Sequence, residues 1–315
     1  LFGIIAPFLI LRRIFPKLSW IHIKVQDFIM GIFMRKCDIC ISLTGYVYAP
    51  RIAQKKGAII IMERGSKHIL EQKKILEKNP HKKNEAIPNR NIKCNLKAYQ
   101  FANFISVASQ HVKESFLLHQ YPENRIFVNP YGVDLSMFKP LPNIPKKYDV
   151  IMVGGWGYEK GCDLIVEAIR KTNYSFIHVG SIKDVDFPQE KNFTHIDPVD
   201  QSKLIEYYNQ AKVFILPSRQ DGFGMVLSQA LACNLPIIGS NNCGAPDLKK
   251  MVELPEYITI IKDYTADAIV TAIHTAIKNY EQLGERIYAG NAIENLTWEA
   301  YGKRYANFLH KIIKQ

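Results

Sequence analysis

The second half of the chain alternates regularly between β-branched runs and helical patterns, and this constrains the fold most. The runs predict strands at 148–155, 174–181, 193–197, 213–218, 235–240 and 257–262. Helical periodicity predicts helices between them, near 161–171, 201–211, 223–233 and 266–280. Such alternation is typical of a parallel, doubly wound sheet, whose ligands bind at the carboxyl ends of the strands.

The first half repeats this pattern less completely. Its runs predict strands near 38–43, 57–62, 103–108 and 125–129. Its helical patterns lie near 22–35, 47–56, 67–78 and 110–118. The half begins on a helix, so we expect the opening strand of a doubly wound domain to be missing, and the Pro-rich segment 138–149 predicts a linker. We therefore expect an α/β fold of two Rossmann-like doubly wound domains, of which the N-terminal one is incomplete.

Positive charge is concentrated in the first half. The formal charge is +12, and residues 1–147 hold 24 Lys and Arg against 9 Asp and Glu. Such a half favours nucleic acid, an anionic membrane or an anionic substrate, and charge alone does not choose between them. Because no nucleic-acid-binding motif accompanies it, we expect no nucleic acid partner. A peripheral contact with an anionic membrane is our preferred interpretation, and a solvated surface is the alternative.

Two segments are candidates for that contact. Residues 1–18 are apolar, but their positive charges follow the apolar run, and about ten apolar residues are too few to span a bilayer. We expect a surface helix there, packed on the core or lying on a membrane, in a chain that starts without Met as a fragment or processed product does. The second candidate, which would otherwise be a solvated helix and loop, is a basic stretch of Lys67, Lys73, Lys74, Lys78, Lys82, Lys83, Arg90, Lys93 and Lys97.

The cysteine and acidic pairs do not predict a metal site. Cys37 and Cys40 stand in a predicted strand, and no second pair lies at the spacing of a zinc site. Asp184 and Asp186 fall in a polar loop without other ligands nearby. We expect reduced thiols in a cytoplasmic protein and no bound metal.

Two glycine-rich turns each join a predicted strand to a predicted helix. In the first, VGGWGYEKG, backbone amides near a helix start favour phosphate oxygens, and Lys160 adds positive charge. A tight turn before any helix would have the same sequence, so this loop alone does not decide. The second, SRQDGFGMVLSQA, places Asp221 before a helix expected from near Phe223, with Gln229 eight residues on.

In order along the chain, these segments resemble retaining nucleotide-sugar glycosyltransferases of the GT-B fold, family 4. NPYGVDLSMF resembles the segment before the interdomain linker, GGWGYEKG the diphosphate loop, and DGFGMVLSQA the region of the E-x7-E pattern. NLTWEAYGKRYANFL resembles the closing helix that crosses back to the first domain. The resemblance implies an acceptor-side domain over 1–142, a nucleotide-sugar-binding domain over 143–290 and a crossing helix over 291–315.

Transferred residue by residue, the resemblance implies a donor site. Lys160 would bind the diphosphate, Asp221 the donor-sugar hydroxyls and Gln229 the ribose hydroxyls, with the nucleobase near Val199. The further donor-binding candidates are Gly154, Gly155, Trp156, Arg219, Gly222, Phe223, Gly224 and Met225. A nucleotide-diphosphate sugar would be the co-substrate, with no metal or other cofactor, and the acceptor would be a glycan or a lipid-linked molecule.

Two residues depart from the family pattern. The second Glu is Gln229, which keeps one acceptor oxygen, so that about 1 kcal/mol of donor binding is at stake. The Arg often found in the phosphate loop is Gly155, and losing its charge beside a diphosphate is more serious. Arg219 is placed to compensate, and a surface role for it is the alternative.

The catalytic candidates are Asp221, Lys160, His68 and Arg64. The last two follow the predicted strand near 57–62, where the family often places a His, and either one would take that position. An exposed structural role is the alternative for His68. Together these features predict a retaining hexosyltransferase of cell-envelope polysaccharide synthesis. Two alternatives stay open, a nucleotide-sugar epimerase and a non-catalytic binding or scaffold protein.

Overall fold

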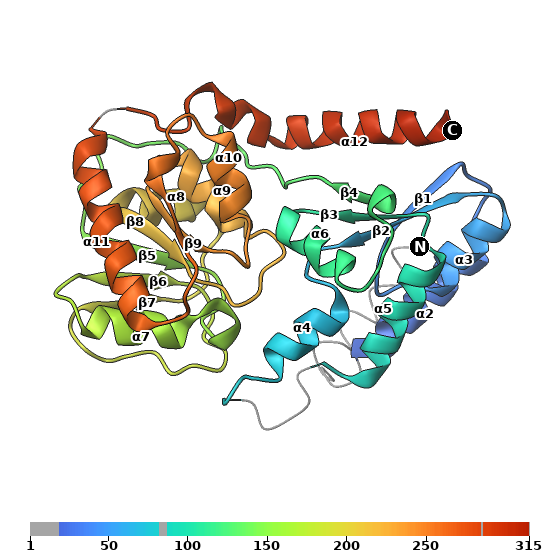
Figure 1. The fold of residues 1–315 in the computed structure, drawn as a ribbon, viewed down its shortest axis with the longest axis horizontal. Coiled ribbons are helices and arrows are strands. Elements are labelled where there is room, and N and C mark those ends of the chain that lie inside the picture. The colour runs from blue at the N-terminus through green and yellow to red at the C-terminus, as the bar shows by residue number, and fades with distance from the viewer. Residues whose placement is uncertain (1–18, 82–86, 285, 315) are drawn as a thin grey trace. The chain divides into compact units, whose positions relative to one another are not determined.

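The computed structural model describes residues 19–81, 87–284 and 286–314 (Figure 1). Contacts divide the chain into two compact units, and each is described by itself. The first comprises Leu1–Arg64, Ile87–Ser106 and Pro122–Phe127, and the second Gly65–Ala86, Val107–Tyr121 and Val128–Gln315. The domain boundaries expected at 142 and 290 stay a prediction. The helix expected over 1–18, and Lys82 and Lys83 of the basic stretch, lie outside the described residues.

A four-stranded sheet lies in the N-terminal half, with strand order β1-β2-β3-β4. Its strands are β1 (Ile39–Leu43), β2 (Ile59–Arg64), β3 (Phe104–Val107) and β4 (Ile126–Val128). Strand β1 pairs in parallel with β2, and Ile39 lies opposite Ile59. The apolar run of β2 buries Ile60, Ile61 and Met62 completely, as expected of an inner strand covered on both faces.

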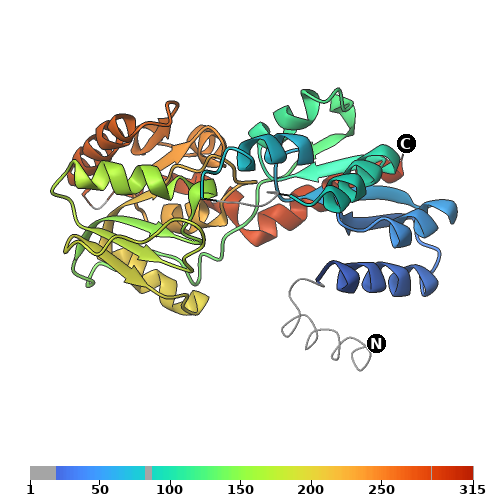
Figure 2. The same ribbon diagram turned by 90° about the horizontal axis from the view of Figure 1, so that it is seen from below.

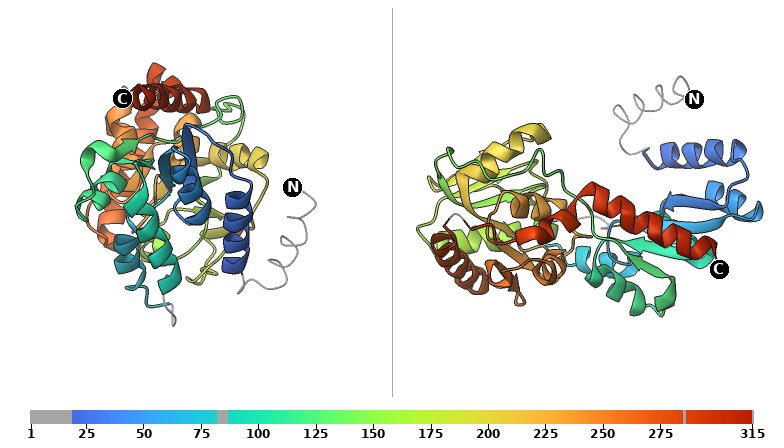
Figure 3. Two further views of the ribbon diagram at one scale, coloured as in Figure 1. Left: turned by 90° about the vertical axis from the view of Figure 1, so that its right-hand side faces the viewer. Right: turned by 90° about the horizontal axis from the view of Figure 1, so that it is seen from above.

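The helices of the first unit are α2 (Ser19–Ile32), α3 (Tyr48–Lys55) and α5 (Asn89–Phe101). Helix α3 lies between α2 and the strands (Figures 2 and 3). A carboxylate joins the two helices, because Asp27 of α2 accepts hydrogen bonds from the amides of Val47, Tyr48 and Ala49 at 2.8–2.9 Å. These amides have no partner within their own helix, so the buried Asp27 caps the start of α3.

The second unit contains a six-stranded sheet of order β10-β9-β8-β5-β6-β7. Its strands are β5 (Tyr148–Val153), β6 (Phe176–Val179), β7 (Phe193–Ile196), β8 (Ala211–Leu216), β9 (Ile237–Ser240) and β10 (Ile258–Ile261). Every neighbouring pair is parallel, and Val150 of β5 lies between Phe176 and Val213. This is the strand order of a Rossmann fold, with the switch point between β5 and β8, so the predicted doubly wound sheet is confirmed.

Helices cover both faces of this sheet. They are α7 (Cys162–Arg170), α8 (Gln201–Gln210), α9 (Met225–Ala232), α10 (Ala245–Met251) and α11 (Ala266–Leu283). Figure 2 shows α7 and α11 on one face and α8 on the other. Helices α4 (Ile69–Leu76), α6 (Gln110–Leu117) and α12 (Trp298–Ile313) complete the unit, with short 3-10 turns at Tyr158–Lys160, Pro255–Tyr257 and Gly290–Leu296.

The helix after Asp221 begins later than expected. The sequence predicted a start near Phe223, but α9 begins at Met225. Gly224, which directly precedes the helix, has φ of +79°, a left-handed backbone conformation that favours glycine and is not helical. Asp221 lies in the loop before this helix.

No helix among residues 19–81, 87–284 and 286–314 is long and apolar enough to cross a membrane. All six cysteines are free thiols. Cys162, Cys233 and Cys243 are buried, whereas Cys37, Cys40 and Cys94 are half-buried.

Candidate functional site

A pocket of about 280 Å³ opens at the carboxyl ends of β5 and β8. It lies at the switch point of the sheet, where doubly wound folds bind their ligands. Among its lining residues are six that the sequence predicted for the donor site: Gly154, Lys160, Asp221, Phe223, Gly224 and Met225. Tyr131 and Gly65 also line it, and they come from segments distant in the sequence.

An ion pair occupies one side of this pocket. Lys160 Nζ donates to Asp221 Oδ2 at 2.6 Å, and the two side chains are only 19% and 18% exposed. Lys160 ends the 3-10 turn after β5, and Asp221 follows β8, so the sheet brings the two glycine-rich turns together. A cation that can meet phosphate thus lies beside a carboxylate that can accept from hydroxyl groups.

The glycines of the pocket serve different purposes. A Cβ at Gly222 would lie 2.0 Å from the carbonyl oxygen of Gly65, so only glycine allows these two backbones to approach. Ser109 Oγ donates to the carbonyl of Gly222 at 2.5 Å and holds the same loop. A Cβ at Gly154, in contrast, would have no atom within 4 Å, and the φ of +125° is what favours glycine there.

Sequence reasoning missed His111, which lies beside the backbone of Asp221 and Gly222. The ring is buried, and within the described part of the chain neither of its nitrogens makes a hydrogen bond of normal geometry. Burial, and then the positive charge of Lys67, lower the pKa of His111 to about 4, so the ring is neutral at pH 7. The helical pattern of α6 does not indicate that His111 lies beside Asp221, because the two residues come together only when the chain folds.

Gln229 lies behind the pocket rather than in its lining. It is buried, and its Oε1 accepts from the hydroxyl of Tyr208 at 2.9 Å. The acceptor oxygen expected for the ribose is therefore already engaged, and the amide nitrogen is the group left for a ligand. Val199, half-buried before α8, does not line the pocket either. Contacts of both residues with a donor stay predictions.

Arg219 and Trp156 have structural contacts that the sequence did not predict. Arg219 donates to both carboxylate oxygens of Asp163 at 2.6 and 2.7 Å and to the carbonyl of Tyr158 at 2.8 Å. Trp156 is fully buried against Phe176, and its amide donates to Ser181. In the structure, Arg219 ties the end of β8 to the start of α7, and the indole of Trp156 belongs to the core. Contacts of these two residues with a donor stay predictions.

The other two catalytic candidates do not line the pocket. His68 is buried rather than exposed, accepts from the amide of Leu70 at the start of α4, and stacks on His119 at 4.0 Å. Arg64 ends β2 in the first unit and donates to Asn95 at 3.2 Å, and burial lowers the pKa of its guanidinium. Of the four candidates, Lys160 and Asp221 are the two that the pocket brings together.

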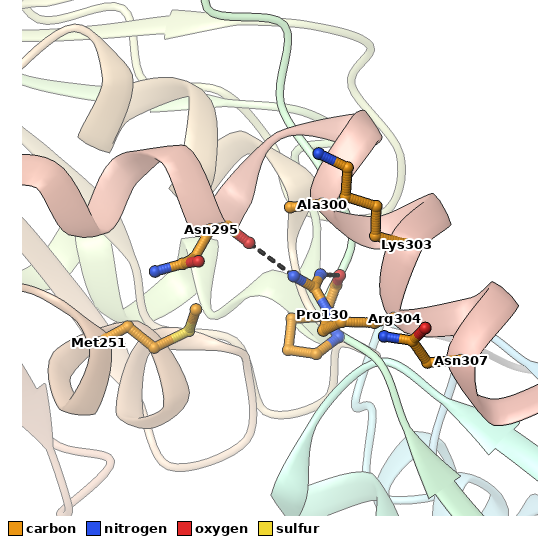
Figure 4. Close-up of a pocket in the computed structure, with 7 residues that line it drawn as sticks. All are labelled: Pro130, Met251, Asn295, Ala300, Lys303, Arg304 and Asn307. Carbon is orange, nitrogen blue, oxygen red and sulfur yellow. Dashed lines mark hydrogen bonds between the residues drawn. The ribbon is translucent and has the colours of Figure 1, made fainter. Parts of the chain in front are cut away.

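A second pocket, of about 440 Å³, lies where α12 meets the segment around Pro130 (Figure 4). Arg304 crosses it and donates to Asn129 Oδ1, the carbonyl of Asn295 and the carbonyl of Pro130 at 2.7–2.8 Å. Since Tyr131 lines the first pocket, this clamp holds the backbone beside one wall of the candidate site.

The sequence matches known proteins over much of its length. Residues 136–292 match the family described as "Glycosyl transferases group 1". A probable sucrose-phosphate synthase of Thermosipho melanesiensis is 26% identical over 242 residues, which are 68% of this chain and 56% of that protein. A GDP-mannose-dependent alpha-(1-6)-phosphatidylinositol monomannoside mannosyltransferase of Mycolicibacterium smegmatis is 23% identical over 66% of this chain and 62% of its own. The match thus spans less than two thirds of each relative.

Solved structures share the fold. Anabaena Alr3699/HepE in complex with UDP and glucose has a TM-score of 0.68 at 13% identity, over 94% of this chain and 83% of its own. Sucrose-phosphate synthase from Thermosynechococcus elongatus has a TM-score of 0.65 at 16% identity, over 88% and 74%. Residues 136–292 therefore match the group 1 glycosyl transferases, and the fold of the chain is that of the GT-B glycosyltransferases.

Proposed function

We propose that this chain transfers a hexose-type sugar from a nucleotide-diphosphate donor to a glycan or lipid-linked acceptor, with retention of configuration, in the assembly of cell-envelope polysaccharide. The observation that carries the proposal is the Lys160–Asp221 ion pair at the switch-point pocket. Relatives in the family support it, because their names include a GDP-mannose-dependent enzyme, and a structural neighbour was solved with UDP and glucose.

Two residues of the pocket would have separate roles in such a reaction. Asp221 would accept hydrogen bonds from donor-sugar hydroxyls, while Lys160 would stabilise the negative charge that develops on the leaving diphosphate. The acceptor oxygen bonds to the anomeric carbon as the bond from that carbon to the diphosphate oxygen breaks on the same face. A leaving diphosphate oxygen takes the acceptor proton. In this scheme no metal and no further cofactor takes part.

The test is a screen of nucleotide sugars by saturation-transfer NMR, starting with UDP-glucose and GDP-mannose, followed by transfer assays with lipid-linked and glycan acceptors. We expect one donor to bind, one product to form with the donor's anomeric configuration, and EDTA to leave the rate unchanged. Donor binding without transfer would indicate a binding protein, and release of an epimerised sugar would indicate an epimerase. The absence of a saturation-transfer signal from every donor would contradict the proposal.

We propose further that the protein works at the cytoplasmic face of an anionic membrane. Large apolar side chains of α2 and the residue after it are exposed, among them Trp20, Phe28, Met30, Ile32 and Phe33. A cation adjoins them, since the guanidinium of Arg90 lies 5.0 Å from the Trp20 ring. Apolar and basic groups side by side suit the headgroup region of such a bilayer.

The basic stretch divides into engaged and exposed residues. Lys67 hydrogen bonds to Asn242, Lys73 pairs with Glu77, and Lys74 pairs with Glu71. Lys74 is exposed although it is paired, and the exposed members outside these three contacts are Lys78, Arg90, Lys93 and Lys97. Sedimentation with phosphatidylglycerol vesicles should exceed that with phosphatidylcholine vesicles, and R90Q/K93Q should reduce the difference. Equal sedimentation with both vesicles would contradict membrane docking.

A further inference from the structure

At Gly155 the resemblance leads one to expect a cationic side chain. The space beside this glycine is occupied instead by the side chain of another residue. A Cβ built on Gly155 would lie 2.3 Å from Cε and 2.7 Å from Nζ of Lys183. A side chain at position 155 would therefore displace the flexible end of the Lys183 side chain. The glycine leaves room for a lysine that arrives from the loop between β6 and β7.

The backbone of that loop is fixed against the glycine-rich turn. Trp156 donates its amide to the carbonyl of Ser181 at 2.8 Å, and Lys183 returns its amide to the carbonyl of Trp156 at 2.9 Å. One residue on, Asp184 Oδ1 accepts from the amide of Tyr158 at 2.9 Å. The Cα of Lys183 is thus held beside the turn by hydrogen bonds on both sides, and its position does not depend on its own ammonium group.

The ammonium of Lys183 is the cation at this turn that is available to a ligand. Lys160 is paired with Asp221 at 2.6 Å, and Arg219 is paired with Asp163. Lys183 is exposed, and among the residues that the structure describes its Nζ has no hydrogen-bond or ion-pair partner. Gly154, which directly precedes Gly155, lines the pocket, and a Cβ built on it would have no atom within 4 Å.

We propose that Lys183 binds the diphosphate of the donor and supplies the positive charge that position 155 lacks. A diphosphate carries more negative charge than Lys160 alone can balance, particularly while Lys160 also contacts Asp221. Charge-assisted hydrogen bonds from a second ammonium would stabilise the bound nucleotide and the leaving diphosphate in the transition state. This inference rests on the proposed function.

The test compares Lys183→Ala with the matched control Lys191→Ala, since Lys191 is an exposed lysine of the same unit. Binding of UDP and GDP is measured by calorimetry, and transfer is measured with the donor found in the screen. We expect K183A to weaken nucleoside-diphosphate binding by about 10- to 100-fold, with a similar loss in kcat/KM, as for one charge-assisted contact. Uridine or guanosine should bind equally well to both variants, and K183R should retain most of the affinity.

A swap makes the test specific for the space at position 155. Gly155→Arg in the K183A background has room for its side chain, and it should restore part of the diphosphate affinity. The same G155R change with Lys183 present should add no affinity, because the two side chains compete for one space.

The outcomes separate this inference from the function on which it rests. Suppose that the wild type binds and transfers, and that the affinity and transfer rate of K183A are within twofold of those of K191A. That result would overturn the role of Lys183 and leave the proposed function standing. A wild-type protein that binds no nucleoside diphosphate would overturn both. Equal loss of uridine and UDP binding in K183A would also overturn the inference, because it would indicate a disturbed loop.

Discussion

The ammonium of Lys160 lies 2.6 Å from Oδ2 of Asp221, although the two residues stand on different glycine-rich turns. In the free protein the two groups therefore bind each other, and each would have to share its hydrogen-bonding capacity with a ligand. Asp221→Asn keeps the shape of the side chain and releases Lys160 from its anionic partner. We expect D221N to bind free UDP or GDP about as well as the wild type or better, but to lose about 10- to 100-fold in kcat/KM, because contacts with the sugar weaken.

Lys160→Met should give the opposite profile. Affinity for the free nucleotide should fall, because the diphosphate loses a charged donor. Calorimetry with UDP or GDP, run beside transfer assays, separates the two variants. The control is Glu299→Gln, which breaks the exposed Lys303–Glu299 pair. If D221N and K160M lost nucleotide affinity equally, the division of roles between the two residues would be wrong.

The Arg219–Asp163 pair predicts a stability effect rather than a binding effect. Arg219→Ala removes two short hydrogen bonds to Asp163 and one to the carbonyl of Tyr158, where the side chains are 15% and 24% exposed. We expect the free energy of unfolding to fall by about 1–3 kcal/mol, because Asp163 and the carbonyl lose a charged donor. Urea denaturation measures it.

A matched control is Arg170→Ala, whose pair with Glu190 is 54% and 44% exposed. Its loss should cost at most about 1 kcal/mol, because exposed pairs are solvated and screened. Nucleotide affinity should stay unchanged in both variants. A large loss of UDP affinity in R219A alone would return Arg219 to the donor site.

Because of His178, we expect the free energy of unfolding to decrease in acid. The ring donates from Nε2 to the carbonyl of Gly154 at 2.8 Å, so Nδ1 accepts from Nδ1 of His195 at 2.9 Å. Burial lowers the pKa of His178 to about 4, with a small contribution from His195 and an opposing one from Gly154. Between pH about 6.5 and 4 the unfolded chain binds the proton and the folded chain does not, so acid lowers the free energy of unfolding by up to about 3 kcal/mol.

The measurement is the urea midpoint at several pH values between 7.5 and 5. In His178→Phe the folded state loses hydrogen bonds, so its stability at pH 7.5 falls, but the dependence on pH should become shallower. His274→Gln is the control, because His274 is exposed on α11. An unchanged slope in H178F would show that His178 is not the group that binds the proton.

The strands of the second unit were predictable because they are short, largely apolar runs, and the inner strands β5, β6, β8 and β9 are buried on both faces. Two helices were not. Helix α5 begins NRNIKCN, whose asparagines favour turns when they are read locally, and packing of Ile92 and Ala98 supplies the missing stabilisation. Helix α10 follows Cys243 and Gly244 and carries Pro246, so its first turn has the composition of a loop.

The candidate site was predictable where one motif contains both the residue and its role. Lys160 and Asp221 stand in glycine-rich turns that follow strands, so topology alone brings them to one edge of the sheet. His111 and Lys183 stand in segments without such a motif, and their positions depend on how loops pack. The pair of Arg219 with Asp163 was not predictable, because the nearness of Arg219 to Asp221 in sequence says nothing about Asp163.

Arg304 predicts coupled losses of stability and activity (Figure 4). Its three hydrogen bonds hold Asn129, Pro130 and Asn295 to α12, and Asn129 is 1% exposed. Arg304→Met would leave these acceptors without a charged donor, and we expect the free energy of unfolding to fall by about 2–4 kcal/mol.

Activity should fall as well, because Pro130 directly precedes Tyr131, which lines the pocket. The centroid of the Tyr131 ring lies 6.0 Å from that of the Phe223 ring, in an edge-to-face arrangement. Lys303→Met is the control, since Lys303 is the neighbouring residue and its side chain is 73% exposed. It should change the urea midpoint by less than a fifth of the effect of R304M, because an exposed ion pair contributes little. Full activity in R304M, measured where that variant is still folded, would show that the clamp stabilises α12 without positioning Tyr131.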